Sequence, residues 1–171
     1  MRLIGKTFML GALLAMTGLL ACAQQPKKEA PKKTNGNMEW NKLTKEEEDV
    51  IVRKGTEYPG TGKLLNNKEK GTYVCRRCNA ALYRSDSKFD SHCGWPSFDK
   101  AIPGSVDYHE DSSHGMNRTE VTCSKCGGHL GHVFADGPIE TTGQRYCINS
   151  LAMDFSPLDR AVKPSEPREL E

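Results

Sequence analysis

The chain has 171 residues and carries 24 Lys and Arg against 22 Asp and Glu, with 36% hydrophobic residues. This length suits one folded domain with extensions. The nearly balanced charge excludes the basic footprint that nucleic-acid binding requires, so no nucleic-acid partner is predicted. Seven cysteines leave metal binding, disulfides and thiol chemistry open.

The first 21 residues have the pattern of an export signal. Arg2 and Lys6 give a short positive start, and residues 7–20 are small or apolar and uncharged. A run of 14 residues is too short to span a bilayer comfortably but fits a signal-peptide core. Its end, Leu19-Leu20-Ala21-Cys22, resembles the lipobox of bacterial lipoproteins, which implies cleavage before Cys22 and lipidation of its thiol. An ordinary signal peptide that contains a cysteine is the alternative.

Residues 22–41 are predicted to be the lipidated cysteine and a disordered tether, because 23–37 have two prolines and no apolar periodicity. Removal of residues 1–21 leaves 22 Lys and Arg against 22 Asp and Glu. The expected protein is therefore an exported, formally neutral lipoprotein that faces the periplasm or the cell exterior. The lipid anchor is its only predicted membrane contact.

One short helix is predicted near the start of the folded domain, which is expected to span residues 42–158. Thr44 is the expected N-cap, and Glu47 three residues later completes a capping box. Lys54 in the last turn and Gly55 after it predict the end of the helix. Val50 and Ile51 are the expected core-facing residues.

The remaining domain is predicted to be mainly β, with antiparallel sheets. Short segments of strand character are separated by clusters of Gly, Pro, Asn, Asp and Ser. A loose tail is expected at residues 159–171, where Pro and Glu recur. The expected strands are residues 71–75, 106–109, 119–123, 129–134, 145–149 and 151–155.

Four cysteines form two CxxC units, Cys75–Cys78 and Cys123–Cys126, the second followed by Gly127-Gly128. Two such units can supply four thiolates to one structural Zn²⁺ site, and zinc is favoured over iron. Disulfides are the competing interpretation because exported proteins oxidise their cysteines, and the six cysteines besides Cys22 allow 15 pairings. A third interpretation is that each CxxC unit is a thioredoxin-like redox centre, although neither unit lies at the start of a helix in a βαβ pattern.

Cys147 is the candidate nucleophile. In a strand of period two, Arg145, Cys147 and Asn149 share one face, and Tyr146 and Ile148 share the other. A guanidinium beside the thiol is expected to favour the thiolate. A small buried residue without reactivity is the alternative. Cys93 is the remaining thiol, and it could resolve an oxidised Cys147, form a structural disulfide with it, or be unrelated.

His129 and His132 lie three residues apart in a glycine-containing strand or turn, where imidazoles could hold a thiolate or donate a proton. Trp95, two residues after Cys93, could form an apolar wall or belong to the core. No role is assigned to the other three histidines.

Three motifs together resemble the methionine sulfoxide reductase B family. They are Cys93-Gly94-Trp95-Pro96-Ser97-Phe98, His129-Leu130-Gly131-His132-Val133-Phe134 followed by Asp136-Gly137-Pro138, and Arg145-Tyr146-Cys147-Ile148-Asn149-Ser150. The two CxxC units fall where zinc-containing members carry theirs, and the resemblance covers roughly residues 42–155. It implies a β-tent-like fold of two antiparallel sheets with a short N-terminal helix and a zinc site made of four cysteines.

The resemblance also implies an oxidoreductase that repairs oxidative damage by reducing methionine-R-sulfoxide in proteins, and in the free amino acid. Cys147 would attack the sulfoxide sulfur, His132 would protonate its oxygen, and Cys93 would resolve the sulfenic acid as a redox-active disulfide. A thioredoxin-like reductant would recycle the disulfide, and the zinc would be structural. The pocket residues would be His129, Arg145 and Asn149 on the polar side and Trp95 and Phe134 at the substrate's methyl end.

Two other function classes stay open. A zinc-ribbon binding module without chemistry would lack a thiol of low pKa. A general thiol–disulfide exchanger would act on scrambled disulfides but not on sulfoxides.

Overall fold

The computed structural model describes residues 40–158, which form one helix, nine strands and three short 3₁₀ turns. The predicted signal peptide, the lipidation site at Cys22, most of the tether and the tail at 159–171 lie outside the described residues. No helix among residues 40–158 is long and apolar enough to cross a membrane.

The single helix, α1 (Lys45–Ile51), begins where the sequence predicts. Thr44 caps it by accepting a hydrogen bond from the backbone N–H of Glu47, and the Glu47 carboxylate accepts one from Thr44 N. Val50 and Ile51 are buried as expected. The helix ends earlier than predicted, because the chain leaves it at Val52 and Lys54 adopts the left-handed region with φ 60°.

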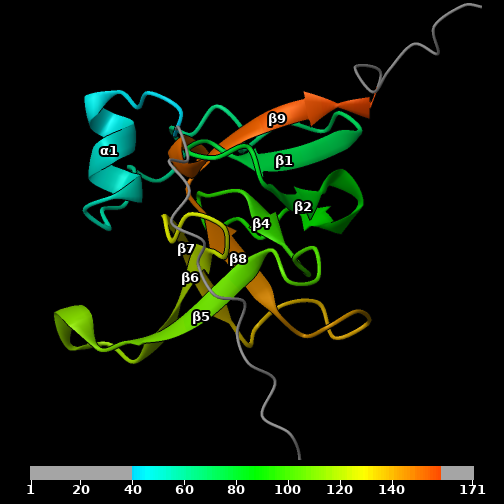
Figure 1. The fold of residues 1–171 in the computed structure, drawn as a ribbon. Coiled ribbons are helices and arrows are strands. Elements are labelled where there is room, and N and C mark those ends of the chain that lie inside the picture. The colour runs from blue at the N-terminus through cyan, green and yellow to red at the C-terminus, as the bar shows by residue number, and fades with distance from the viewer. Residues whose placement is uncertain (1–39, 159–171) are drawn as a thin grey trace, which may run out of the picture. The chain divides into compact units, whose positions relative to one another are not determined.

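Two antiparallel sheets make up the rest of the domain (Figure 1), so the mainly β prediction is confirmed. The smaller sheet has the order β2-β1-β9, and the larger has the order β3-β4-β8-β7-β6-β5. The strands are β1 (Gly71–Cys75), β2 (Ala81–Arg84), β3 (Lys88–Phe89), β4 (Ser97–Phe98), β5 (Val106–Asp111), β6 (Arg118–Cys123), β7 (His129–Phe134), β8 (Arg145–Ile148) and β9 (Met153–Pro157). The 3₁₀ turns are η1 (Ser85–Ser87), η2 (Ser113–Gly115) and η3 (Ser150–Ala152).

Aromatic side chains from both sheets meet in the core. Tyr83 on β2 stacks on Phe98 of β4 with ring centroids 4.4 Å apart, and Tyr73 on β1 meets the edge of the same ring at 4.9 Å. All three are fully buried. This packing joins the small sheet to the large one, and burial of such rings is a main source of stability in a small domain.

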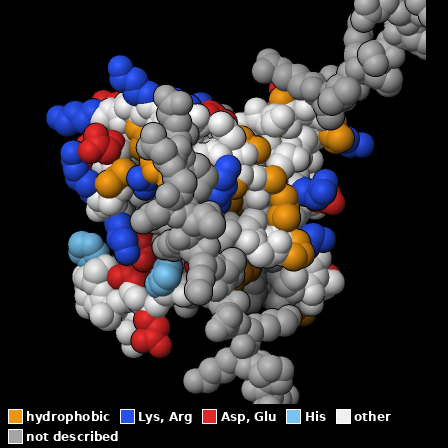
Figure 2. Space-filling model, in the orientation of Figure 1, with side chains coloured by type: hydrophobic (Ala, Val, Ile, Leu, Met, Phe, Trp, Pro, Cys, Tyr) orange, Lys and Arg blue, Asp and Glu red, His pale blue; other side chains and the backbone are white. Residues whose placement is uncertain are grey.

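Strands β2, β3 and β4 were not predicted, and the last predicted strand is displaced. The segment expected at 151–155 begins as η3, and β9 starts at Met153. Charged side chains of both signs are interspersed on the face shown in Figure 2, as the balanced composition indicates.

Candidate functional site

Cys147 lies in the middle of the large sheet. Its strand, β8, pairs with β4 on one side and β7 on the other, so Cys147 is directly opposite both Ser97 and His132. The predicted alternation is present: Tyr146 and Ile148 are buried in the core, and Cys147 is half-buried on the other face. The sheet thus fixes the thiol among residues from three separate strands.

Cys93 lies in the loop between β3 and β4, and its Sγ is 3.5 Å from Sγ of Cys147. Both thiols are free and half-buried. The hydroxyl of Ser91 donates to the Cys93 sulfur at 3.0 Å, and the Ser97 hydroxyl lies 3.4 Å from it. An S–S bond is about 2.05 Å long, so a shift of roughly 1.5 Å would join the two sulfurs.

The negative charge of this reduced pair rests on Cys93. A hydrogen bond from the Cys147 thiol, with further ones from Ser91 and Ser97, lowers the pKa of Cys93 to about 4. The same contact with Cys93, together with burial, raises the pKa of Cys147 above its ordinary value. The pair therefore holds one thiolate and one proton at neutral pH.

This charge distribution differs from the expectation that Arg145 makes Cys147 a thiolate. Arg145 does act to lower the pKa of Cys147, but the neighbouring Cys93 and burial have the larger effect. The guanidinium is also engaged elsewhere: it donates two hydrogen bonds to Asp136, at 2.9 and 2.8 Å, and lies 4.5 Å over the Phe134 ring. Its positive charge is thus largely neutralised by a carboxylate.

A small pocket of about 110 Å³ opens beside Cys147. Its walls combine one indole, one phenyl ring and several polar groups, so it can receive a short apolar group that carries a polar atom. The lining residues are Thr56, Trp95, Arg118, Gly131, His132, Phe134, Cys147 and Asn149. Trp95, His132, Phe134, Cys147 and Asn149 were named from the sequence, and the structure brings them to this one pocket.

Gly131 lets β7 lie close to the reactive strand. A Cβ at this position would stand 2.1 Å from the carbonyl oxygen of Cys147. Any other residue would therefore push β7 away from β8 and displace His132 from its place opposite the thiol.

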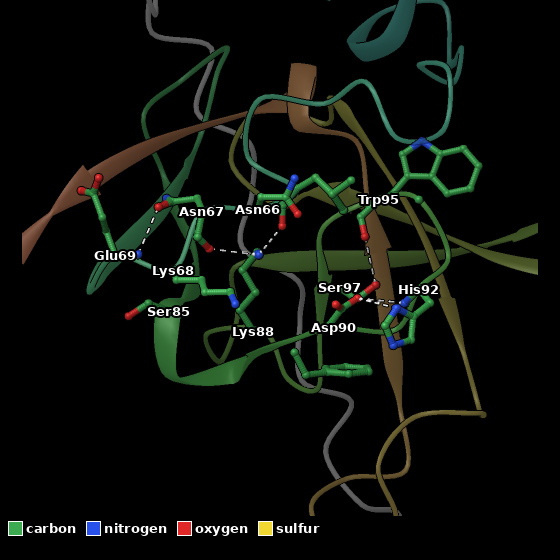
Figure 3. A pocket seen from close by; sticks show the side chains of 13 residues that line it. Asn66, Asn67, Lys68, Glu69, Ser85, Lys88, Asp90, His92, Trp95 and Ser97 are labelled. Atoms are coloured by element: carbon green, nitrogen blue, oxygen red, sulfur yellow. Dashed lines mark hydrogen bonds and ion pairs between the residues drawn. The ribbon is translucent and has the colours of Figure 1, made fainter.

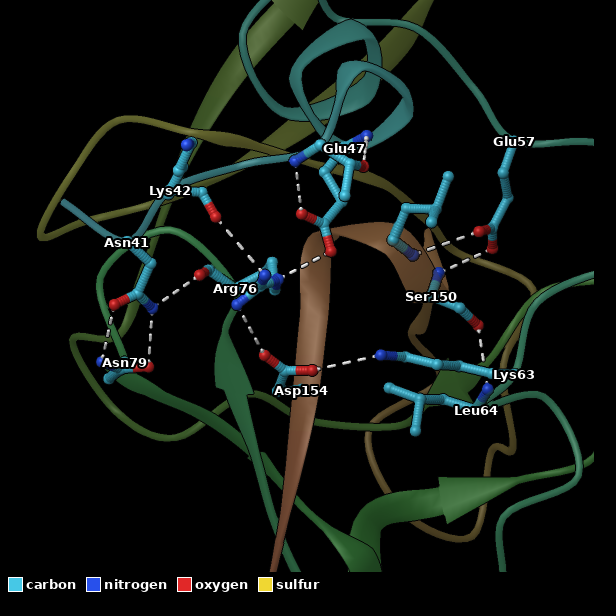
Figure 4. A network of polar contacts seen from close by, with 12 residues as sticks. Asn41, Lys42, Glu47, Glu57, Lys63, Leu64, Arg76, Asn79, Ser150 and Asp154 are labelled. Carbon is cyan, nitrogen blue, oxygen red and sulfur yellow. Dashed lines mark hydrogen bonds and ion pairs between the residues drawn. The ribbon is translucent and has the colours of Figure 1, made fainter.

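A buried loop residue, Glu57, holds the indole and the amide of the pocket. Its carboxylate accepts hydrogen bonds from the backbone N–H groups of Ser150, at 2.6 Å, and Leu151, at 3.1 Å (Figure 4). Its backbone N–H donates to Asn149 Oδ1, and its carbonyl accepts from Trp95 Nε1 at 3.1 Å. Sequence reasoning gave Glu57 no role, because Trp95 lies 38 residues further along the chain and its other partners about ninety.

The two histidines of β7 have different partners. His129 is buried, its Nδ1 lies 2.8 Å from Glu120 Oε1, and burial lowers the pKa of its imidazole. His132 is more open and bonds through Nε2 to Asp111 Oδ2 at 2.7 Å. The rings lie 5.6 Å apart at a steep angle. His132 lines the Cys147 pocket and His129 does not.

A wider cavity of about 510 Å³ lies on another side of the Cys93 loop (Figure 3). Asn67, Lys88, Asp90 and His92 are among its lining residues, and neither Cys93 nor Cys147 is. The Lys88 ammonium is already committed, since it donates to the carbonyls of Leu65 and Asn67. The smaller pocket is therefore the candidate active site, because it contains the reactive thiol.

The two CxxC units converge, as the sequence predicts. The Sγ atoms of Cys75, Cys78, Cys123 and Cys126 all lie within 4.8 Å of one another, with two pairs at 3.6 Å. Four sulfurs at about 2.3 Å from a tetrahedral metal would be about 3.8 Å apart, so the donors are placed to hold one ion. All four are free thiols, and the thiol pair of the pocket is not part of their cluster.

Each CxxC unit makes the same turn. The backbone N–H of Asn79 donates to the carbonyl of Cys75, and that of Gly127 donates to the carbonyl of Cys123. Asn79 and Gly127 have positive φ, 58° and 69°, which Asn and Gly adopt at least cost. One unit follows β1 of the small sheet and the other follows β6 of the large sheet, so a bound metal would join the sheets.

Arg76, inside the first CxxC unit, also ties this turn to the helix (Figure 4). Its Nε donates to Glu47 at 2.6 Å, and Nη1 donates to Asp154 of β9 at 3.4 Å. The arginine is about a quarter exposed, so these contacts contribute more to orientation than to stability.

Comparison with known proteins agrees with this geometry. Residues 43–157 match the SelR domain family. A peptide methionine sulfoxide reductase MsrB of Leptospira interrogans is 56% identical over 119 residues, which cover 68% of this chain and 90% of that protein. The MsrB of Agrobacterium fabrum is 50% identical over 131 residues, 75% of this chain and 96% of that protein.

Among solved structures, the Mis18 'Yippee-like' domain aligns with a TM-score of 0.43 and 19% identity over 53% of this chain and 98% of that chain, which is too partial to carry an inference. The SelR match extends over the two CxxC units, the Cys93 loop and the Cys147 strand. This chain belongs to the SelR family, that of the methionine sulfoxide reductases B.

Proposed function

We propose that the protein is a peptide-methionine (R)-S-oxide reductase that uses Cys147 and Cys93. The observation that carries this proposal is the pair of free thiols 3.5 Å apart, with Cys147 at the base of a small pocket walled by Trp95 and Phe134. Methionine sulfoxide has a matching shape, since an apolar methyl group lies beside a polar S–O bond. The names of the relatives, which are 50–56% identical, agree with this chemistry.

In the first step the Cys147 sulfur attacks the sulfoxide sulfur. His132 accepts the proton of the Cys147 thiol and passes it to the sulfoxide oxygen. The oxygen moves to Cys147 as the methionine thioether leaves. One thiol and one sulfoxide thus give one thioether and one sulfenic acid, and no external electron donor is needed.

In the second step the Cys93 thiolate attacks the sulfur of the Cys147 sulfenic acid and displaces hydroxide, which takes a proton from solvent and leaves as water. The thiolate is the attacking form, and the hydroxyls of Ser91 and Ser97 beside the Cys93 sulfur help to stabilise it. The product is a Cys93–Cys147 disulfide. An external dithiol of the thioredoxin type is the proposed reductant of this disulfide, and oxidised proteins are the proposed substrates.

We infer that the ion of the four-cysteine cluster is Zn²⁺. A closed set of four thiolates leaves no position for substrate, so the ion would be structural. We also propose that the protein is exported and anchored through lipidated Cys22. This rests on the charge and hydropathy pattern of residues 1–22.

The decisive experiment is single-turnover reduction of the separate R and S epimers of a protected methionine sulfoxide by pre-reduced protein, without recycling reductant. About one equivalent of methionine from the R epimer alone is expected, with a Cys93–Cys147 disulfide visible by mass spectrometry. If neither epimer is reduced by protein that is folded and metal-loaded, the proposed function is wrong. Activity on scrambled disulfides alone would favour a thiol–disulfide exchanger.

Replacement of the resolving thiol separates the two steps. Cys93→Ser is expected to reduce about one equivalent of R-sulfoxide and then stop with a thioredoxin-type reductant, because the sulfenic acid has no neighbouring thiol. A sulfenic-acid trap followed by mass spectrometry should label Cys147 in this variant and not in the wild type. Normal multiple turnover by Cys93→Ser would contradict the resolving role.

A further inference from the structure

Asp111, the last residue of β5, accepts hydrogen bonds from three sides. Its Oδ2 accepts from His132 Nε2 and from Arg118 Nη2, both at 2.7 Å, and its Oδ1 accepts from the backbone N–H of Ser113 at 2.9 Å. Its side chain is 17% exposed. The contacts to Ser113, His132 and Arg118 hold the pKa of this carboxyl well below its usual range, so Asp111 is an anion at any working pH.

The backbone fixes this carboxylate. Asp111 and Arg118 are directly opposite each other at the turn end of the β5–β6 hairpin, and the chain between them includes η2. His132 lies on the next strand, β7, opposite Glu120 of β6. The hairpin therefore brings the carboxylate to the His132 ring, while β8 brings Cys147 to the other side of the same residue.

We propose that Asp111, anchored by Arg118, is the positioning residue that fixes the tautomer and the orientation of His132. An ionised carboxylate can only accept, so Nε2 of His132 carries the hydrogen in this contact. Nδ1 is then the one ring nitrogen left to exchange a proton with the sulfoxide oxygen. This inference rests on the proposed function and names the atom through which its proton step passes.

Other charged groups around His132 are already paired among themselves. Glu120, across the β6–β7 ladder, is bonded to Lys54 at 2.8 Å and to His129 at 2.8 Å. Burial lowers the pKa of His129, so that ring is neutral. On the β8 side Cys147 carries its proton and Arg145 is paired with Asp136. Asp111 is thus the anion bonded to the His132 ring.

Sequence reasoning missed both residues of this pair. Arg118 also lines the Cys147 pocket, and its Nε is buried without a hydrogen-bond partner among the described residues. The same guanidinium holds Asp111 through Nη2. Carboxylate–imidazole pairs of this kind commonly orient functional histidines, and loss of the carboxylate typically costs about 10- to 100-fold in metal affinity or activity.

The test compares Asp111→Asn with Asp107→Asn, which makes the same chemical change at an exposed position of the same strand. The single-turnover rate constant on the R-sulfoxide is expected to fall about 10- to 100-fold in Asp111→Asn, with little change in the substrate concentration at half-saturation. Asp107→Asn should match the wild type in both.

A second readout does not depend on activity. ¹⁵N NMR of the His132 ring should show the Nε2-protonated tautomer in the wild type and a mixture in Asp111→Asn. Asp111→Glu, which restores a carboxylate, should recover part of the rate and of the Nε2-protonated population. Thermal melting and metal content of each variant exclude a general folding defect.

The proposal is overturned if the neutral wild-type ring carries its hydrogen on Nδ1, or if Asp111→Asn slows the reaction without changing the tautomer. A wild-type protein that reduces neither epimer would refute the role of His132 in proton transfer along with the proposed function. In that case the NMR measurement would still decide whether Asp111 fixes the tautomer of the His132 ring, so the two failures can be told apart.

Discussion

Cys147→Ser is expected to abolish sulfoxide reduction, with a fall in rate of about 10⁴-fold or more, while the fold and the metal stay intact. A serine hydroxyl is a far weaker nucleophile than a thiol and cannot form the sulfenic acid that Cys93 attacks. The position tolerates serine structurally, because it is half-buried on the polar face of β8 and the core residues of that strand are Tyr146 and Ile148. Single-turnover methionine formation measures the loss.

Cys93→Ser is the matched control for this experiment. It makes the same chemical change 3.5 Å away and should keep the first turnover. Circular dichroism, melting temperature and metal content should be alike in both variants. A Cys147→Ser protein that still forms methionine would assign the attack to another group. Loss of metal in this variant would contradict the separation of reactive thiols from the four-cysteine cluster.

The elements predicted well are those whose signal is local. The alternation around Cys147 places one face against the core in any antiparallel sheet, so the neighbours of the thiol could be predicted from its own strand. The capping box at Thr44 and the two CxxC turns are equally local, since each is complete within five residues. These features account for the start of α1, the metal ligands and the candidate nucleophile.

The features missed depend on partners far away in the sequence. Strands β3 and β4 have two residues each and no period of their own, so they are defined by the pairing of β3 with β4 and of β4 with β8. Asp111 meets His132 only because the β5–β6 hairpin and the β6–β7 pair have their particular registers. The charge on Cys93 likewise requires its 3.5 Å contact with Cys147. Periodicity contains no information about such distances.

Cys123→Ser is expected to lose the metal and to lower the melting temperature by about 20 °C or more. Binding of a structural zinc by four thiolates contributes on the order of 10 kcal/mol, which is comparable to the whole stability of a typical domain. Even a loss of half that amount shifts the melting temperature of a domain of this size by about 20 °C. Metal analysis by mass spectrometry and thermal melting followed by circular dichroism measure the two effects.

The size of this effect follows from where the ligands lie. Cys75 ends β1 of the small sheet and Cys123 ends β6 of the large sheet, so the ion would tie the two sheets together at this point. Cys93→Ser, outside the cluster, should retain metal and melt like the wild type. Strong chelation of the wild type should reproduce the Cys123→Ser melting curve without touching the thiol pair. A chelated protein that melts at the wild-type temperature would show that aromatic packing around Phe98, rather than the metal, holds the sheets together.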